Sequence, residues 1–68
     1  MFYEVGYNCG NYYSINMITA ETEASACEAA RRRAERKGYK VVYVTEKTEA
    51  EAAVNVRKGM PMYAASAS

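Results

Sequence analysis

Residues 38–51 read GYKVVYVTEKTEAE, and the fold follows from this stretch. Its first half, residues 39–45, is rich in β-branched and aromatic side chains and follows a glycine, which is typical of a β-strand. Its second half begins at Thr48, and Glu51 three residues later completes the capping-box motif that starts a helix. A strand that passes directly into a capped helix predicts a mixed architecture of sheet and helices.

Upstream of this stretch, the chain predicts a β-hairpin followed by a helix. Residues 2–8 and 12–20 are rich in aromatic and β-branched side chains, and the intervening residues NCGN supply the Gly and Asn that hairpin turns need. An Ala-rich helix is then predicted to begin after the cap residue Thr22 and to end before Gly38, because glycine readily takes the left-handed conformation that closes a helix.

Downstream, the second helix is predicted to end at Lys58, with Gly59 as its left-handed closing residue. A short fourth strand can form near Met62, just after a proline that prevents the helix from continuing. The final residues AASAS have little to bury. We therefore predict one domain over residues 1–63 and a disordered tail over residues 64–68.

The predicted order of elements makes this an α+β fold. Because strands this short need helices laid across them, we expect a two-layer ββαβα sandwich, with a small three-stranded sheet and both helices on one face. Period-two alternation assigns one set of side chains to that covered face: Tyr3, Val5, Tyr7, Tyr13, Ile15, Met17, Tyr39, Val41 and Tyr43.

The position of the third strand has two solutions. It lies beside the first strand, in order 2-1-3, or beside the second, in order 1-2-3, and we favour the first of these. In both cases residues 41–44, the most apolar run of any strand, lie at an edge of the sheet. A bare apolar edge favours pairing with another chain.

The other face of the sheet is expected to be open, with an apolar end that binds a partner. Its candidate partner-binding residues are Phe2, Tyr12, Ile18, Val42 and Val44. The chain has only 13 Phe, Val, Ile and Met residues and no Leu or Trp, which is a thin core for an isolated domain of 68 residues. We therefore expect this surface to be covered, either by a second copy in a dimer or by a different protein.

The composition excludes most catalytic and metal sites. The chain has no His, and all eight acidic residues are Glu, so Ser-His-Asp and Cys-His catalysis lack their components. Two cysteines cannot make a structural zinc site, and no glycine-rich phosphate-binding loop is present. We predict a non-enzymatic protein with no catalytic residue, no metal and no cofactor.

Both cysteines are expected to be free thiols. The chain shows no basic segment leading into an apolar run, as a signal peptide would, and no stretch long enough to span a membrane, so we expect a cytoplasmic, reducing location. Cys27 falls in a stripe of small residues on the first helix and is expected to be buried. Cys9 lies in the hairpin turn and is expected to be more exposed.

Residues 31–37 read RRRAERK and hold the strongest concentration of charge, a net +4. This candidate basic patch consists of Arg31, Arg32, Arg33, Arg36 and Lys37. Cations favour the C-terminal end of a helix because of its macrodipole, and Glu28 can pair with Arg32 one turn later. We interpret the run as a solvated helix end, with an acidic protein or a nucleic acid as the alternative ligands. The net charge of +1 provides no general attraction to nucleic acid or membranes.

The layout as a whole resembles that of short uncharacterised α/β proteins from bacterial phages and mobile elements. The features concerned are the hairpin, the Thr-Glu-Ala start of an Ala-rich helix, the strand, and the Arg-Lys-Gly-Met-Pro close at residues 57–61. The resemblance implies no catalytic residue, and it implies an inhibitor or accessory factor that binds a larger host or defence protein. We therefore expect a protein-binding module. The alternative is a nucleic-acid-binding accessory protein that uses the basic helix end from Arg31 to Lys37.

Overall fold

The computed structural model describes residues 1–65. Its elements are β1 (Phe2–Asn8), β2 (Tyr13–Thr19), α1 (Glu23–Lys37), β3 (Lys40–Lys47), α2 (Glu49–Arg57) and β4 (Met62–Ala64). The four strands form one sheet in the order β3-β1-β2-β4. The α+β class and the short fourth strand near Met62 are confirmed.

The helix boundaries follow from the predicted caps. At the start of α1 the Thr22 hydroxyl accepts a 3.1 Å hydrogen bond from the backbone N–H of Ser25, and Gly38 closes the helix with a φ of 73°. At the start of α2 the complete capping box is present, with 2.9 and 3.1 Å hydrogen bonds that Thr48 and Glu51 exchange. These bonds satisfy backbone groups that a helix end leaves unpaired.

The sheet topology confirms strand order 2-1-3. β1 is central and pairs antiparallel with both β2 and β3, whereas β4 pairs parallel with the outer side of β2. Just before the β2–β4 pairing begins, the Met17 N–H donates a 2.9 Å hydrogen bond to the Pro61 carbonyl. β3 is therefore an edge strand, as predicted, and β4 lies at the opposite edge.

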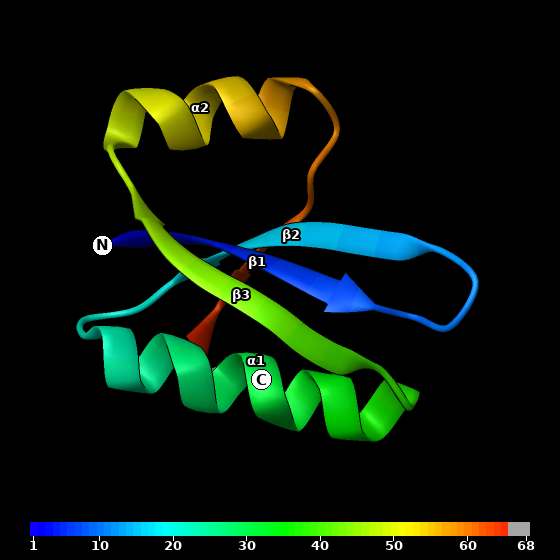
Figure 1. Cartoon of the computed structure of the whole chain (residues 1–68). Coiled ribbons are helices and arrows are strands. Elements are labelled where there is room, and N and C mark those ends of the chain that lie inside the picture. The colour runs from blue at the N-terminus through cyan, green and yellow to red at the C-terminus, as the bar shows by residue number, and fades with distance from the viewer. Residues whose placement is uncertain (66–68) are drawn as a thin grey trace.

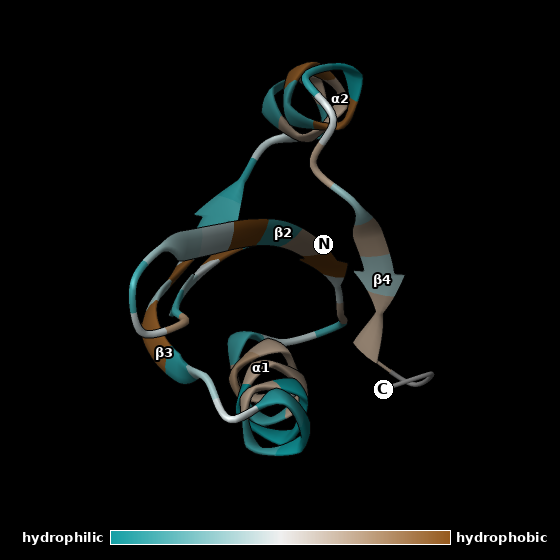
Figure 2. Cartoon of the chain, turned by 90° about the vertical axis from the view of Figure 1, so that its right-hand side faces the viewer, coloured by the Kyte–Doolittle hydropathy of each residue, from teal (hydrophilic) through white to brown (hydrophobic). Residues whose placement is uncertain are grey.

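The two helices cover opposite faces of the sheet, so the prediction that both lie on one face in two layers is wrong. Figures 1 and 2 show α1 on one side of the strands and α2 on the other. Packed helices stand about 8–10 Å apart, whereas the axes of three adjacent strands together span only about 10 Å. A single helix therefore fills the width of one face of the sheet. The opposite face carries apolar side chains of its own.

The predicted assignment of side chains to the faces is wrong for β2. Asn8 pairs with Tyr13, so Tyr3 lies opposite Ile18. Opposite residues of an antiparallel pair share a face, so Ile18 lies with Tyr3 beneath α1, and Ile15 belongs to the other face. The cause is the length of the turn, because moving the pairing by one residue exchanges the two faces of a strand.

β3 contains a β-bulge where it pairs with β1. Gly6 pairs with Tyr43, but the next residue of β1 pairs with Val41, which makes Val42 the extra residue. Val42 is 57% exposed, whereas Val44 packs against the core beneath α1. The prediction that Val42 and Val44 belong to one open surface is therefore wrong.

The main core lies between β1, β2 and α1. Large sheet side chains pack there against a row of alanines: Tyr3, Val5, Tyr7 and Ile18 against Ala26, Ala29, Ala30 and Ala34. Because alanine is small, α1 lies close to the sheet and the tyrosine rings fill the space. Helical rotation of about 100° per residue takes Cys27 away from Ala26, so Cys27 is exposed. Cys9 is partly buried against the core, so the predicted exposures of the two cysteines are reversed.

The C-terminal boundary differs from the predicted one. Ala64 belongs to β4, and Ala65 packs against the core. The predicted tail is therefore wrong for these two residues, because β4 extends beyond residue 63. The rest of the predicted tail, residues 66–68, lies outside the described residues.

Candidate functional site

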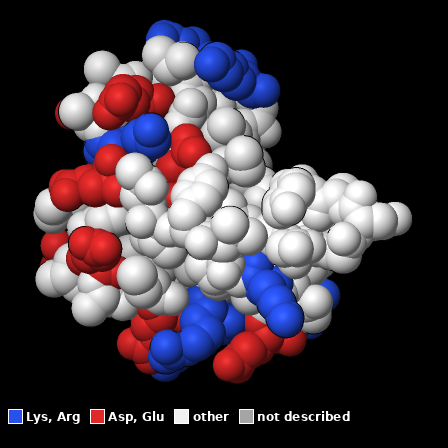
Figure 3. All heavy atoms as spheres, viewed as in Figure 1, with Lys and Arg blue, Asp and Glu red and all other residues white. Residues whose placement is uncertain are grey.

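The part of the β1–β2 hairpin that lies toward its turn is free of charge, although a quarter of the chain's residues are charged. No Lys, Arg, Asp or Glu occurs from Val5 to Ala20. Figure 3 shows an extension of the molecule that has no charged side chains. In the same view, Figure 1 places the β1–β2 turn at this position. We call residues 8–15 at this end of the sheet the tyrosine hairpin.

Local hydrogen bonds close the turn of the tyrosine hairpin. The Cys9 N–H donates to the Tyr12 carbonyl at 2.9 Å, and the Gly10 N–H donates to the Asn8 side-chain oxygen at 2.9 Å. Gly10 has a φ of 103°, a conformation that side-chain-bearing residues rarely adopt. The turn therefore has a defined shape and projects its neighbouring side chains in fixed directions.

Three large side chains of the tyrosine hairpin lie open to solvent. Tyr13 is 70% exposed, Tyr12 is 55% exposed and Ile15 is 37% exposed. Tyr13 and Ile15 lie on the face that α2 covers, but α2 reaches only the part of this face around Glu4 and Met17. Beyond the end of α2, this apolar surface has no cover within the described chain.

Tyr12 is held in place by a second tyrosine. Its hydroxyl lies 3.3 Å from that of Tyr39, whose ring in turn lies 6.1 Å from the ring of the buried Tyr7 at an angle of 54°. The hydrogen bond with Tyr12, together with burial, raises the pKa of Tyr39 to about 12. These contacts tie the exposed Tyr12 ring to the core, so it is ordered before any partner binds.

A half-buried carboxylate fixes α2 to the sheet. Glu4 accepts hydrogen bonds from the Tyr43 hydroxyl at 2.5 Å and from the Asn55 side-chain amide at 2.9 Å. The Asn55 amide also lies 3.5 Å from the Met17 sulfur. Burial and the hydrogen bond to Glu4 raise the pKa of Tyr43 to about 12. Tyr43 therefore lies on the α2 side of the sheet, whereas its predicted companions Tyr3 and Tyr7 lie on the other.

The structure does not bring the predicted partner-binding residues together. Ile18 is 2% exposed in the core beneath α1, and Val44 packs there too. Phe2 is half-buried on the opposite face, in an apolar hollow of about 380 Å³ beside α2. Val42 and Tyr12 are exposed near the same end of the sheet, but Val42 belongs to β3 and Tyr12 precedes β2, and β1 lies between these strands. The predicted open face does not form, because the register of β1 and β2 places each residue of β2 on the side of the sheet opposite to that expected.

The predicted basic residues do not form one patch either. Arg32 pairs with Glu28 at 2.7 Å, as predicted, and Arg33 lies over the Tyr63 ring at 3.8 Å in a cation–π contact. The other three, Arg31, Arg36 and Lys37, are exposed. Lys37 and Lys40 flank Tyr39 in the chain, so two cations lie at the base of the tyrosine hairpin.

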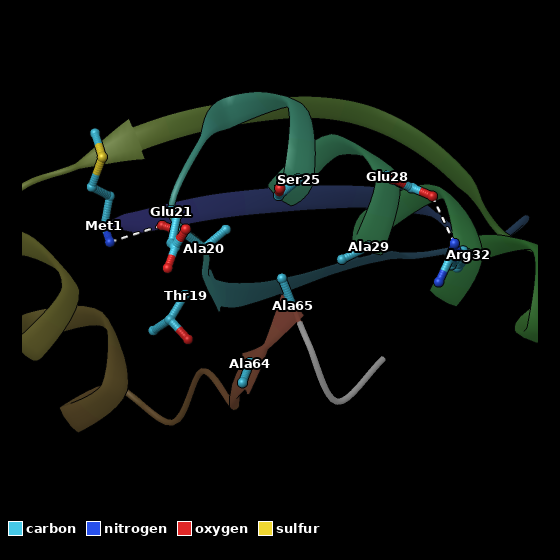
Figure 4. A pocket seen from close by; sticks show the side chains of 10 residues that line it. All are labelled: Met1, Thr19, Ala20, Glu21, Ser25, Glu28, Ala29, Arg32, Ala64 and Ala65. Carbon is cyan, nitrogen blue, oxygen red and sulfur yellow. Dashed lines mark hydrogen bonds and ion pairs between the residues drawn. The ribbon is translucent and has the colours of Figure 1, made fainter.

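A second hollow, apart from the one beside α2, has its cationic groups already paired. It has a volume of about 520 Å³ and lies between the start of α1 and the end of β4 (Figure 4). Its charged groups include the Met1 amine, which donates to the Ala20 carbonyl at 2.9 Å, and the Arg32–Glu28 pair. These cations already have protein partners.

Neither known proteins nor recognised site types assign a function to the chain. Comparison with protein-family models, with curated proteins and with solved structures finds no match. Within residues 1–65 no three Cys or Glu side chains lie close enough together to hold a metal ion. No helix in that range has both the length and the apolar character needed to cross a lipid bilayer.

Sequence reasoning missed two members of the exposed surface. Tyr13 and Ile15 are predicted to be covered by helices, and they do lie on the face of α2, but alternation cannot show where along a strand the covering helix ends. The signal that could have found them is the absence of charge over residues 5–20. Charged residues are depleted at the centres of protein interfaces, and aromatic residues are enriched there.

Proposed function

We propose that this chain is a small protein-binding module that acts by contact with its partner and without catalysis, and that the tyrosine hairpin is its binding surface. The observation that carries the proposal is the exposure of Tyr12, Tyr13 and Ile15 on a projecting hairpin without charge. Single exposed apolar residues are common, but several of them on the two sides of one ordered projection are typical of an interaction site.

The residue types of the tyrosine hairpin suit protein recognition. Tyrosine offers a large rigid ring and a polar tip at a small cost in conformational entropy, while Asn, Ser and Gly provide adaptable hydrogen bonds. Residues 8–15, NCGNYYSI, consist almost entirely of these types. Because the turn and the Tyr12–Tyr39 contact already order this end, little further ordering opposes binding.

The biological role that we propose is that of an inhibitor or accessory factor of a phage or mobile element, acting in the cytoplasm on a larger protein. The absence of His and Asp supports action without catalysis. The layout of the chain, which resembles small proteins of that kind, supports the proposed origin.

The test is affinity capture from a lysate of the source cell with the immobilised full chain. The double variant Tyr13→Ser with Ile15→Ser removes the apolar surface without adding charge. The control is Val54→Ser on α2, because Val54 is 40% exposed and lies outside the hairpin. A stoichiometric partner that the double variant loses and the control keeps is the expected result. If both variants keep the partner, the hairpin is not the binding surface.

A second candidate function is binding of single-stranded nucleic acid. It is favoured by the position of Lys37 and Lys40 on either side of Tyr39, whose hydroxyl meets that of Tyr12. Aromatic rings beside cations can stack bases and contact phosphates. Binding of labelled oligonucleotides at low salt, lost with Arg36→Glu and weakened steeply by added salt, would support this function.

Self-association along β3 is a separate proposal. Among the described residues no strand pairs with the outer edge of β3, and Val42 is exposed there. Lys40 and Lys47 stand at its two ends, where charge discourages pairing, and the apolar residues between them favour it. A second copy paired along this edge would extend the sheet and present two tyrosine hairpins.

A further inference from the structure

Both helices run in the same direction, toward the tyrosine hairpin. α1 follows Thr19 and α2 follows Lys47, and both of these residues pair with Phe2 at the end of the sheet farthest from the turn. Lys40, just after α1, pairs with Asn8 beside the turn. Figure 1 shows the same arrangement, with the starts of both helices at one end of the sheet. Their macrodipoles therefore add, with the negative ends toward the hairpin.

The charged side chains follow this common direction. The first turns of the two helices are acidic, with Glu23 in α1 and with Glu49 and Glu51 in α2. The last turns are basic, with Arg36 and Lys37 in α1 and Arg57 in α2. Lys40 adds another cation at the hairpin end, where Glu35 also lies, and Lys58 follows Arg57 at the end of α2. Within the described residues none of these five cations forms an ion pair.

From the cations at the base of the tyrosine hairpin we infer that the partner's binding surface is acidic: an apolar pocket that takes the hairpin, with carboxylates on the rim that faces Lys37 and Lys40. The inference rests on the proposed function. The hairpin itself has no charge, but Lys37 and Lys40 lie at its base on the side of Tyr39, whereas Arg57 lies farther away, in the hollow that it lines with Phe2. Rim charges of this kind guide association and reject partners of the wrong sign. Because the net charge is only +1, the guidance would come from these local cations rather than from overall charge, and it acts against the helix macrodipoles, whose negative ends point the same way.

The geometry favours a protein over a nucleic acid as the acidic partner. Modules that stack bases present two or three aromatic rings on one face with cations beside them. Here Tyr12 contacts Tyr39 on the α1 side, whereas Tyr13 shares the face of α2 with Ile15. Two rings on opposite faces form the two sides of a wedge, which fits into a pocket and offers no flat platform for successive bases.

The test uses a library of random peptides displayed on phage particles and selected on the immobilised full chain. We expect the selected peptides to combine Asp or Glu with an aromatic or aliphatic residue, and to lose binding to Tyr13→Ala. Lys40 and Lys47 give a matched pair of variants, because they stand at opposite ends of the same strand. Lys40→Glu is expected to weaken the selected peptides about fivefold, and Lys47→Glu less than twofold.

The outcomes separate this inference from the proposed function. If no peptide is selected, or if Tyr13→Ala leaves binding unchanged, the proposed function fails and the inference fails with it. If binding depends on Tyr13 but the peptides are not enriched in Asp and Glu, or if Lys40→Glu and Lys47→Glu act equally, only the inference is overturned. If a single-stranded oligonucleotide displaces the peptides with a steep dependence on salt, the acidic partner is a nucleic acid and the inference is also overturned.

Discussion

Glu4 on β1 and Asn55 on α2, 51 positions apart in the chain, share a hydrogen bond of 2.9 Å. The same carboxylate accepts the hydroxyl of Tyr43 from β3, so one side chain joins a central strand, an edge strand and a helix. Few apolar side chains are buried on this side of the sheet: Ala52 is the one buried residue of α2, and Met17 of β2 is buried beside Asn55. Polar contacts therefore contribute much of the interaction between α2 and the sheet.

Removing this junction is expected to destabilise the fold. Asn55→Ala and Glu4→Gln each lose a hydrogen bond to a carboxylate, and such bonds contribute about 1.5–3 kcal/mol. The free energy of unfolding, measured by chemical denaturation at neutral pH, is expected to fall by about that amount in each variant. Glu35→Gln, at an exposed glutamate of α1, is the control and should change it little. Equal stability of all three variants would contradict the assigned role of Glu4.

Gly6 is required because the Tyr43 ring lies over it. A Cβ atom added at Gly6 would overlap the ring atoms of Tyr43, whose hydroxyl is held by Glu4. Gly6→Ala is therefore expected to cost about 1–3 kcal/mol of stability by overpacking. In a Tyr43→Ala background the same change should cost much less, since the ring is gone. An equal cost in both backgrounds, in a double-mutant cycle, would show that the two residues do not interact.

Stability is expected to fall at alkaline pH as two tyrosines ionise. The pKa values of Tyr39 and Tyr43 are raised from 10.0 to about 12 in the folded chain. The stabilisation from their neutral forms is complete below pH 10, where the unfolded chain also keeps its protons, and is lost as the pH rises through 12. Tyrosinate absorbance should show at least these two groups titrating late, since burial also raises the pKa values of Tyr3 and Tyr7, and Glu4→Gln should lower the midpoint of Tyr43. Simultaneous titration of all tyrosines near their ordinary pKa would contradict this expectation.

The capping box at the start of α2 is expected to contribute measurably to stability. Thr48→Ala removes the hydroxyl that accepts the Glu51 N–H at 3.1 Å, and loss of such a cap costs about 1 kcal/mol. Because the two residues bond reciprocally, Thr48→Ala and Glu51→Ala together should cost less than the sum of their separate effects. Strict additivity in thermal unfolding would indicate that the box does not act as a unit.

Self-association through β3 predicts a response to one added charge. Sequence reasoning would change Val42 and Val44 together to lysine, but Val44 packs against the core, and its replacement would disturb folding. Val42→Lys alone places a charge on the exposed part of the edge strand. Sedimentation at high micromolar concentration should show a dimer for the wild-type chain and a monomer for Val42→Lys. A wild-type chain that stays monomeric would contradict the proposal.

Local signals in the sequence predicted the helices and strands and their order well, because the boundaries of each element depend on residues that are neighbours in the chain. Thr22, Gly38 and the Thr48–Glu51 pair act within one helical turn, so their effect can be inferred without tertiary information. The position of β3 beside β1 is the one that we favour, although the pattern of strands also allows β3 beside β2.

The faces of the sheet could not be assigned in the same way. Alternation shows that Tyr13 and Ile15 share a face, but only the pairing of Asn8 with Tyr13 decides that this face is the one opposite Tyr3. A turn longer by one residue would exchange Ile18 for Met17 beneath α1. The candidate site depends on this register, which is why Tyr12 alone of the three exposed hairpin residues was predicted as a site residue.

The binding constant of the captured partner for wild-type chain and for Tyr13→Ala tests the central claim most directly. An aromatic residue at the centre of an interface contributes 2 kcal/mol or more, which corresponds to about 30-fold in affinity. We predict at least that loss for Tyr13→Ala, with an unchanged stability of the free chain and little effect of Val54→Ala on α2. A partner that binds both variants as tightly as the wild-type chain would contradict the assignment of the tyrosine hairpin as the binding surface.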